Sequence, residues 1–173
     1  MQRSSSILQK PVLSNMDIVD QATRSRMMSG IHGKDTKPEL VVRKALHALG
    51  FRYRLHGRGI PGRPDLVFPK HAALIQVQGF FWHGHKCHLF KLPSTRTEFW
   101  HEKIKSNIVR DKKNLAACRK LGWKTLVVWE CAIKGKTRLP TEELAAVMQN
   151  WLLYDDQDAE IVGREDRKVK RQK

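Results

Sequence analysis

The chain is organised around residues 74–90, which read LIQVQGFFWHGHKCHLF. The first five residues have the apolar, β-branched character of a strand, and Gly79 ends it. Three large aromatic residues follow, and after them comes a cluster of histidines with one cysteine. Aromatic side chains need burial or a flat partner such as a nucleobase, and histidine and cysteine are zinc ligands. We therefore expect the rest of the chain to be a scaffold that presents this stretch to an acidic partner.

The charge of the chain points to a polyanion. Its 173 residues carry a formal net charge of +16, and the pI is near 10.2. Such an excess favours nucleic acid over the alternatives, which are a solubilising surface, a ribosomal protein or a membrane-surface protein. No apolar run approaches the ~20 residues that span a bilayer, and the N-terminus has no apolar signal core. We expect a cytoplasmic, nucleoid-associated protein without a membrane partner.

Helix and strand signals alternate along the chain. Thr36, Pro38 and Glu39 form the capping-box start of a helix that ends at Gly50. Strands are expected over residues 51–55, 65–68, 74–78 and 123–129, a long basic helix from Thr97 to about Leu121, and a last helix from Pro140 through Trp151. This order predicts a small α/β sandwich around a mixed sheet.

The two ends of the chain differ from its middle. Residues 1–15 are rich in serine and are expected to be disordered. Residues 16–155 are expected to form one domain with an N-terminal arm, because this length can bury a self-sufficient core. Residues 156–173 are charged, and we expect them to form a flexible tail.

The three cysteines, Cys87, Cys118 and Cys131, form no disulfide framework, and in a reducing cytosol they would be metal ligands or core residues. A structural zinc needs four ligands. His85 and Cys87 supply two, and Cys131, at the end of a buried strand, could supply a third. The spacing leaves the fourth ligand open, and unliganded side chains near a surface loop are the alternative.

Asp65 follows Pro61-Gly62-Arg63-Pro64 at the entrance to a short strand. Nucleases that cut phosphodiesters with such a hairpin hold Mg²⁺ on this aspartate, and add a carboxylate and a lysine on the next strand. Here that strand has Gln76-Val77-Gln78, with neither group. On this pattern alone, Asp65 could simply end a loop.

Several short motifs occur in order along the chain, and they are specific. They are residues 22–25 (ATRS), 61–65 (PGRPD), 81–83 (FWH), 89–91 (LFK), 95–100 (TRTEFW) and 128–132 (VWECA). With these motifs, residues 17–135 resemble the very-short-patch repair (Vsr) DNA mismatch endonucleases. The resemblance implies a restriction-endonuclease-like sandwich with a structural zinc. It also implies a Mg²⁺-dependent enzyme that nicks one DNA strand on the 5′ side of the thymine in a T·G mismatch. Such mismatches arise when 5-methylcytosine is deaminated, and the nick would begin their very short patch repair.

The resemblance also implies roles for single residues. Asp65 would hold Mg²⁺ together with the backbone carbonyl of Val77, and Glu39 would hold a metal-bound water. His83 would be the catalytic histidine, which activates water or moves a proton. The implied zinc ligands are His85, Cys87, Asp111 and Cys131.

The DNA-contacting residues implied by the resemblance are Met28, Phe81, Trp82, Trp100, Lys103 and Asn107. The three aromatic residues would wedge into the base stack from the major groove and Met28 from the minor groove, while the lysine and the asparagine would read the mispair. Unstacking costs a few kcal/mol and least at a mispair, so wedging itself favours damaged sites. Core packing and a solvated basic helix face are the alternatives.

Gln78 departs from the resemblance, because the family usually has a second histidine there. Phe80, where a cysteine is usual, is a smaller departure. Glutamine hydrogen-bonds but cannot take or give a proton near neutral pH. Two further functions therefore stay open: a Vsr-like restriction endonuclease, and a mismatch-binding protein with weakened catalysis. We also expect a monomer with partners in the repair machinery.

Overall fold

A computed structural model describes residue 23 and residues 34–164. The chain divides into two compact units, Met1–Ile31 and His32–Lys173, and the elements below all belong to the second unit. The predictions for residues 1–15, for most of the N-terminal arm and for Met28 fall outside the described residues.

The first helix, α2 (Lys37–Ala48), begins and ends as its sequence predicts. The Thr36 hydroxyl accepts a hydrogen bond from the Glu39 amide at 3.4 Å and donates one to the Glu39 carboxylate at 3.0 Å. Gly50 follows the helix with a φ of 85°, which glycine adopts at little cost.

Five strands form one sheet in the order β1-β2-β3-β4-β5. They are β1 (Arg54–Leu55), β2 (Leu66–Phe68), β3 (Ala73–Gln78), β4 (Lys124–Trp129) and β5 (Ala159–Ile161). The first three strands are antiparallel, and β3, β4 and β5 are parallel, so the predicted mixed sheet is confirmed. Because β3 and β4 are parallel, both deliver their following residues to the same edge of the sheet.

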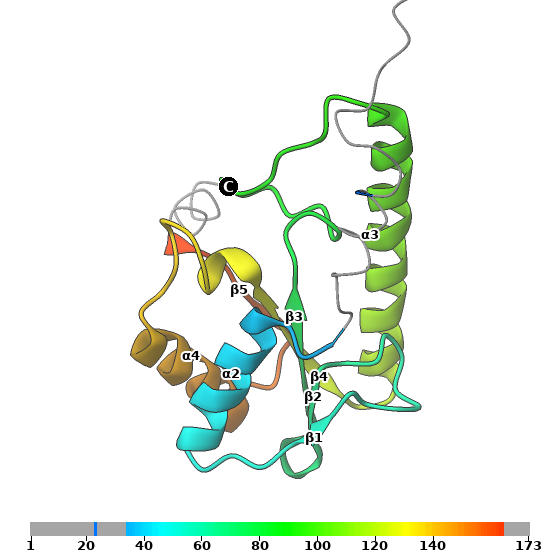
Figure 1. The fold of residues 1–173 in the computed structure, drawn as a ribbon. Coiled ribbons are helices and arrows are strands. Elements are labelled where there is room, and N and C mark those ends of the chain that lie inside the picture. The colour runs from blue at the N-terminus through cyan, green and yellow to red at the C-terminus, as the bar shows by residue number, and fades with distance from the viewer. Residues whose placement is uncertain (1–22, 24–33, 165–173) are drawn as a thin grey trace, which may run out of the picture. The chain divides into compact units, whose positions relative to one another are not determined.

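Helices cover both faces of the sheet, as Figure 1 shows. Helices α2 and α4 (Thr141–Tyr154) lie on one face, and α3 (Thr97–Lys120) lies on the other. The larger core packs α2 and α4 against the strands and includes Val42, Leu46, Phe68, Ile75, Leu126, Leu144, Met148 and Trp151. Two short 3₁₀ helices, η1 (Pro69–His71) and η2 (Glu130–Ala132), follow β2 and β4. Among the described helices, none is long and apolar enough to cross a membrane.

The first strand is shorter than predicted. Phe51 and Tyr53 lie before β1 and pack their rings against Phe68, with centroid distances of 6.4 and 5.5 Å. The Tyr53 hydroxyl also donates a hydrogen bond to the backbone carbonyl of Arg43. Leu55, the last residue of β1, is 45% exposed. The apolar contacts of this segment are therefore made by its two aromatic residues.

The predicted boundary at Asp155 is wrong, because the chain re-enters the sheet as β5 beside β4. Ile161 is buried in the core. Asp158 prepares this return, since its carboxylate accepts a hydrogen bond from the Thr125 amide at 2.8 Å. The acidic residues of this turn look like a solvated tail in the sequence, but one of them binds the sheet.

Helix α3 begins at Thr97, as predicted, but Thr97 is not its cap. Arg96, with a φ of 53°, is the N-cap, and Thr97 is the first helical residue. The Thr97 hydroxyl instead donates to the carbonyls of Pro93 and Ser94, each at 3.3 Å. At the other end, Gly122 follows the helix with a φ of 80°, as predicted.

Candidate active site and metal centre

Asp65 lies immediately before β2, at the edge where the hairpin meets β3. Its Oδ2 accepts a hydrogen bond of 2.7 Å from the backbone N–H of Val77. Burial raises the pKa of the Asp65 carboxyl to about 6 in spite of this hydrogen bond, and the neighbouring Glu39 carboxylate acts in the same direction as burial. The anion is therefore held at a free-energy cost that a bound cation would offset.

Glu39 is the second carboxylate at this place. It is 4% exposed, and its Oε2 accepts hydrogen bonds from Arg43 Nη2 at 2.8 Å and from the Asp35 amide at 2.9 Å. The capping box turns the first turn of α2 so that this carboxylate faces inward, toward Asp65. Glu39 thus has two roles: it caps the helix, as the sequence predicts, and it lies in the candidate site.

A histidine that sequence analysis missed completes this cluster. The donor atoms of Glu39, His56 and Asp65 all lie within 4.8 Å of one another. Two carboxylates and an imidazole are a donor set that suits a divalent cation. Only the register of the hairpin could have revealed His56, because it lies nine residues before Asp65 in a loop without any motif.

His83 is held by a carboxylate from α3. Its Nδ1 lies 2.7 Å from Asp111 Oδ2, and both side chains are partly exposed. When Nδ1 carries the proton and donates it to Asp111, Nε2 is left as an acceptor. The pair therefore has the orientation of a histidine prepared for proton transfer.

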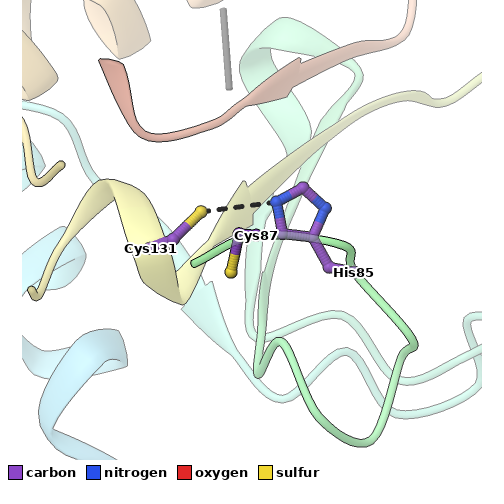
Figure 2. A group of neighbouring side chains, drawn as sticks. All are labelled: His85, Cys87 and Cys131. Carbon is purple, nitrogen blue, oxygen red and sulfur yellow. Dashed lines mark hydrogen bonds between the residues drawn. The ribbon is translucent and has the colours of Figure 1, made fainter. Parts of the chain in front are cut away.

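The thiol and imidazole groups form a second cluster. Cys131 Sγ lies 3.4 Å from His85 Nε2, and the donor atoms of His85, Cys87 and Cys131 lie within 4.8 Å of one another (Figure 2). Cys131 is fully buried and also accepts a hydrogen bond from the Gly163 amide. The His85 ring stacks on Trp129 with centroids 4.2 Å apart. Two cysteines and a histidine are the donor set that zinc prefers.

Asp111 Oδ2 lies 2.7 Å from His83 Nδ1, and Asp111 is not among the three residues whose donor atoms lie within 4.8 Å of one another. Its place as the fourth zinc ligand therefore stays a prediction. Among the described residues, the cluster has three protein donors. Cys118 lies on the face of α3 that packs against the sheet: it is fully buried, and its thiol donates to the carbonyl of Pro61.

The predicted aromatic residues lie together. Phe81 contacts Trp82 and Trp100 with ring centroids 5.1 and 5.4 Å apart, and the two tryptophans are 5.9 Å apart. All three are partly exposed, and the neighbouring Phe99 is 49% exposed. Since these rings come from the loop after β3 and from the start of α3, only the fold brings them into one aromatic cluster.

Comparison with known proteins identifies the family. A model of the family described as DNA mismatch endonuclease Vsr matches residues 16–89. The DNA mismatch endonuclease Vsr of Escherichia coli K12 is 41% identical over 145 residues, which are 84% of this chain and 93% of that protein. The chain belongs to the Vsr family.

Vsr-like nicking enzymes are similar as well. The type II nicking enzyme V.NmeAIP of Neisseria meningitidis serogroup A is 45% identical over 69% of this chain and 86% of that enzyme. V.XorIIP of Xanthomonas oryzae, also a type II nicking enzyme, is 41% identical over 68% of this chain and 86% of that enzyme.

In this Vsr family member, the glutamines of β3 form a pair. Gln78 Nε2 donates to Gln76 Oε1 at 3.1 Å, and both side chains are buried. The two residues share one face of the strand, because side chains two apart point the same way. Gln78 is thus held by a side chain that the sequence analysis left without a role.

The two residues predicted to read the mispair in Vsr-like recognition differ in their surroundings. Lys103 is exposed on α3. Asn107, one helical turn later, donates from Nδ2 to the backbone carbonyl of Trp82 at 2.9 Å. It therefore ties the loop that carries the aromatic cluster to α3.

Proposed function

We propose that this protein is a Mg²⁺-dependent DNA mismatch endonuclease that nicks one strand on the 5′ side of the thymine of a T·G mispair. The observation that carries the proposal is the buried Asp65 carboxylate, whose donor atom lies within 4.8 Å of those of Glu39 and His56. Membership of the Vsr family supports the same reading. The mixed sheet, with Asp65 at the start of the β2–β3 hairpin, also fits a restriction-endonuclease-like fold.

Asp65 would hold the catalytic cation, and Glu39 would hold a water bound to it. When bound, Mg²⁺ would neutralise charge on the scissile phosphate and lower the pKa of a coordinated water. The backbone carbonyl of Val77 is the second direct donor in this proposal. Within a strand, the N–H and C=O of one residue point to the same edge, and the Val77 N–H reaches Asp65. This geometry supports a carbonyl directed toward the aspartate, and it does not depend on the Val77 side chain.

His83 would carry the proton transfer. Its hydrogen bond to Asp111 fixes the ring and directs the other nitrogen, Nε2, to serve the attacking water or the leaving oxygen. Asp111 would also stabilise the imidazolium form that follows proton uptake. Its other predicted role, as the fourth zinc ligand, would use the same carboxylate.

The zinc site would have a structural role. His85 and Cys87 come from the loop after β3, and Cys131 comes from η2 after β4. A zinc ion held by these three residues would cross-link the two segments that leave the same edge of the sheet. The loop that carries His83 and the aromatic cluster would thereby keep its position.

The aromatic cluster would recognise the lesion. Phe81, Trp82 and Trp100 would wedge into the base stack, which costs least at a mispair. The basic surface would supply affinity for the phosphates, so binding should weaken steeply with salt. Lys103 and Asn107 would contact the mispair, and Met28 would enter from the minor groove. The protein would act as a monomer, and the repair machinery would then process the nicked DNA.

A second candidate function has one observation in its favour. Gln78, buried and hydrogen-bonded to Gln76, cannot exchange a proton with the phosphate region. A protein that binds mismatches but cuts slowly would have this arrangement. It predicts normal affinity for T·G duplexes with a low nicking rate.

The nicking reaction itself tests the proposal. A duplex with one T·G pair, labelled in turn on each strand, is incubated with the protein and with Mg²⁺ or without it. We expect a single nick, in the thymine strand on its 5′ side, that requires Mg²⁺ and is lost in Asp65→Ala. The Asp65→Ala variant should still bind the duplex. Nicking by Asp65→Ala at the normal rate would contradict the proposed site, and tight binding without a nick by the wild type would favour the second candidate.

A further inference from the structure

We propose that His56 is a direct ligand of the catalytic cation, in addition to Asp65. The inference rests on the proposed function, because it assigns a further donor to the same metal site. Neither the motifs of the sequence nor the usual acid-and-lysine arrangement of such nucleases would have selected this residue.

The hairpin brings His56 to the metal site. Leu55 pairs with Leu66, and one step further the His56 amide donates to the Asp65 carbonyl at 3.0 Å. His56 and Asp65 are therefore neighbours across two antiparallel chains, and such pairs present their side chains on one face. The Gly57 amide then donates to the Pro64 carbonyl, which continues the ladder past the formal end of the strands.

The distances fit one octahedral ion. Two donors that each lie about 2.1 Å from such an ion are about 3.0 Å apart when adjacent and about 4.2 Å apart when opposite. The donor atoms of Glu39, His56 and Asp65 all lie within 4.8 Å of one another, an upper limit that covers this range. One cation can therefore be shared by Asp65 and His56, with Glu39 close enough to hold a water bound to it.

The backbone of His56 is constrained as well. Its φ is 51°, in the left-handed region that residues other than glycine rarely occupy. Such strain is retained where the surrounding structure requires it, and it is frequent at ligand-binding positions. Here the left-handed residue lies in the ladder, directly opposite Asp65.

An ordinary ion pair does not account for this histidine. Its Nε2 lies 3.7 Å from Asp35 Oδ1, which is too far for a hydrogen bond. Asp35 is 53% exposed, and Arg43 already binds the same oxygen at 2.5 Å. The interaction with Asp35 is therefore weak, whereas His56 also favours the charged form of Asp65.

An imidazole ligand gives the site a measurable property. Mg²⁺ prefers oxygen donors, whereas transition metals accept imidazole nitrogen more readily. Mn²⁺ can replace Mg²⁺ at carboxylate sites, and its electron spin detects a directly bound ¹⁴N. His56 should therefore favour Mn²⁺ over Mg²⁺.

The test uses the full-length, zinc-loaded protein without DNA. Mn²⁺ binding is followed by the electron paramagnetic resonance of the free ion, and nitrogen coupling to bound Mn²⁺ by electron spin echo modulation. We expect the wild type to show nitrogen coupling. The His56→Gln variant should lose the coupling and bind Mn²⁺ roughly 10- to 100-fold more weakly, with a smaller change for Mg²⁺. His47→Gln, which removes an exposed histidine at the end of α2, should behave like the wild type.

The outcomes separate this inference from the proposed function. Absence of nitrogen coupling in the wild type, or coupling that survives in His56→Gln, would overturn the assignment of His56. The first of these results does not depend on whether a variant folds. A wild-type protein that nicks T·G duplexes without nitrogen coupling would refute the ligand and leave the function intact. Coupling that is lost in His56→Gln would support the ligand even if no duplex were cut.

Discussion

The substitution Asp65→Asn should abolish nicking and, in the absence of divalent cations, stabilise the protein at neutral pH. Asparagine keeps an oxygen that can accept the hydrogen bond from the Val77 amide. It removes the charge that burial and the Glu39 carboxylate disfavour. The negative charge of Asp65 would thus lower the stability of the metal-free protein, and it would contribute to function by binding the cation.

The size and direction of the effect follow from the pKa. The folded protein raises the pKa of Asp65 from 3.8 to about 6, so it binds the proton more tightly than the unfolded chain does. The free energy of unfolding therefore falls as the pH rises through this interval and stays low above it. A difference of about 2 pKa units corresponds to about 3 kcal/mol. Asp65→Asn should recover up to this amount at pH 8 and almost none at pH 4.

Urea unfolding between pH 4 and pH 8, in buffer without divalent cations, measures this difference. Added Mg²⁺ should stabilise the wild type but not Asp65→Asn, since only the wild type has the full site. Asp156→Asn, which removes an exposed carboxylate, is the control and should change little at any pH. An Asp65→Asn protein no more stable than the wild type at pH 8, or a difference between them that did not depend on pH, would show that the Asp65 charge does not destabilise the fold.

Three further predictions follow from the other parts of the site. His83→Ala should lower the single-turnover nicking rate by roughly 10²–10⁴, and Asp111→Asn should lower it less, with T·G duplex binding by fluorescence anisotropy unchanged in both. An unaltered rate in His83→Ala would exclude it as the proton carrier. Cys131→Ala should lose its zinc, as measured by metal analysis, and should have a lower melting temperature. Cys118→Ser should keep its zinc although the substitution disturbs the core. A wild-type protein that contains no zinc would rule the site out. Gln78→His should raise the nicking rate with little change in affinity for the T·G duplex, because glutamine, unlike histidine, cannot transfer a proton in the transition state. Equal rates for the two proteins, both at ordinary nuclease speed, would show that Gln78 is tolerated.

Local patterns in the sequence predicted much of the fold. The capping box at Thr36 and Glu39 and the glycine after the helix depend on neighbours within four residues, so they survive unchanged in the structure. The buried strands β3 and β4 were recognisable because long apolar runs leave few alternatives. The three thiol and imidazole groups of the second cluster were also recognised, since they follow directly from these strands.

Features that depend on distant partners were not predictable. β5 pairs with β4, a strand about thirty residues earlier, and the acidic residues that precede β5 made this segment resemble a solvated tail. The partner of Asp111 depends on the rotation of α3 about its axis, which a helix with a mostly polar surface does not reveal in its sequence. His56 needed the register of the hairpin, and the buried pair of Gln76 and Gln78 needed the packing of α3 on the sheet.

Two duplexes that differ in one base show whether a mismatch directs the cleavage. Single-turnover rate constants are measured with Mg²⁺ on a duplex with one T·G pair and on its T·A counterpart. The account predicts a nick 5′ to the thymine of the mispair, with the T·A duplex cut roughly 10- to 100-fold more slowly or not at all, as expected when one base pair is worth 1–3 kcal/mol of recognition. Equal rates on the two duplexes, or no cleavage of either, would contradict it.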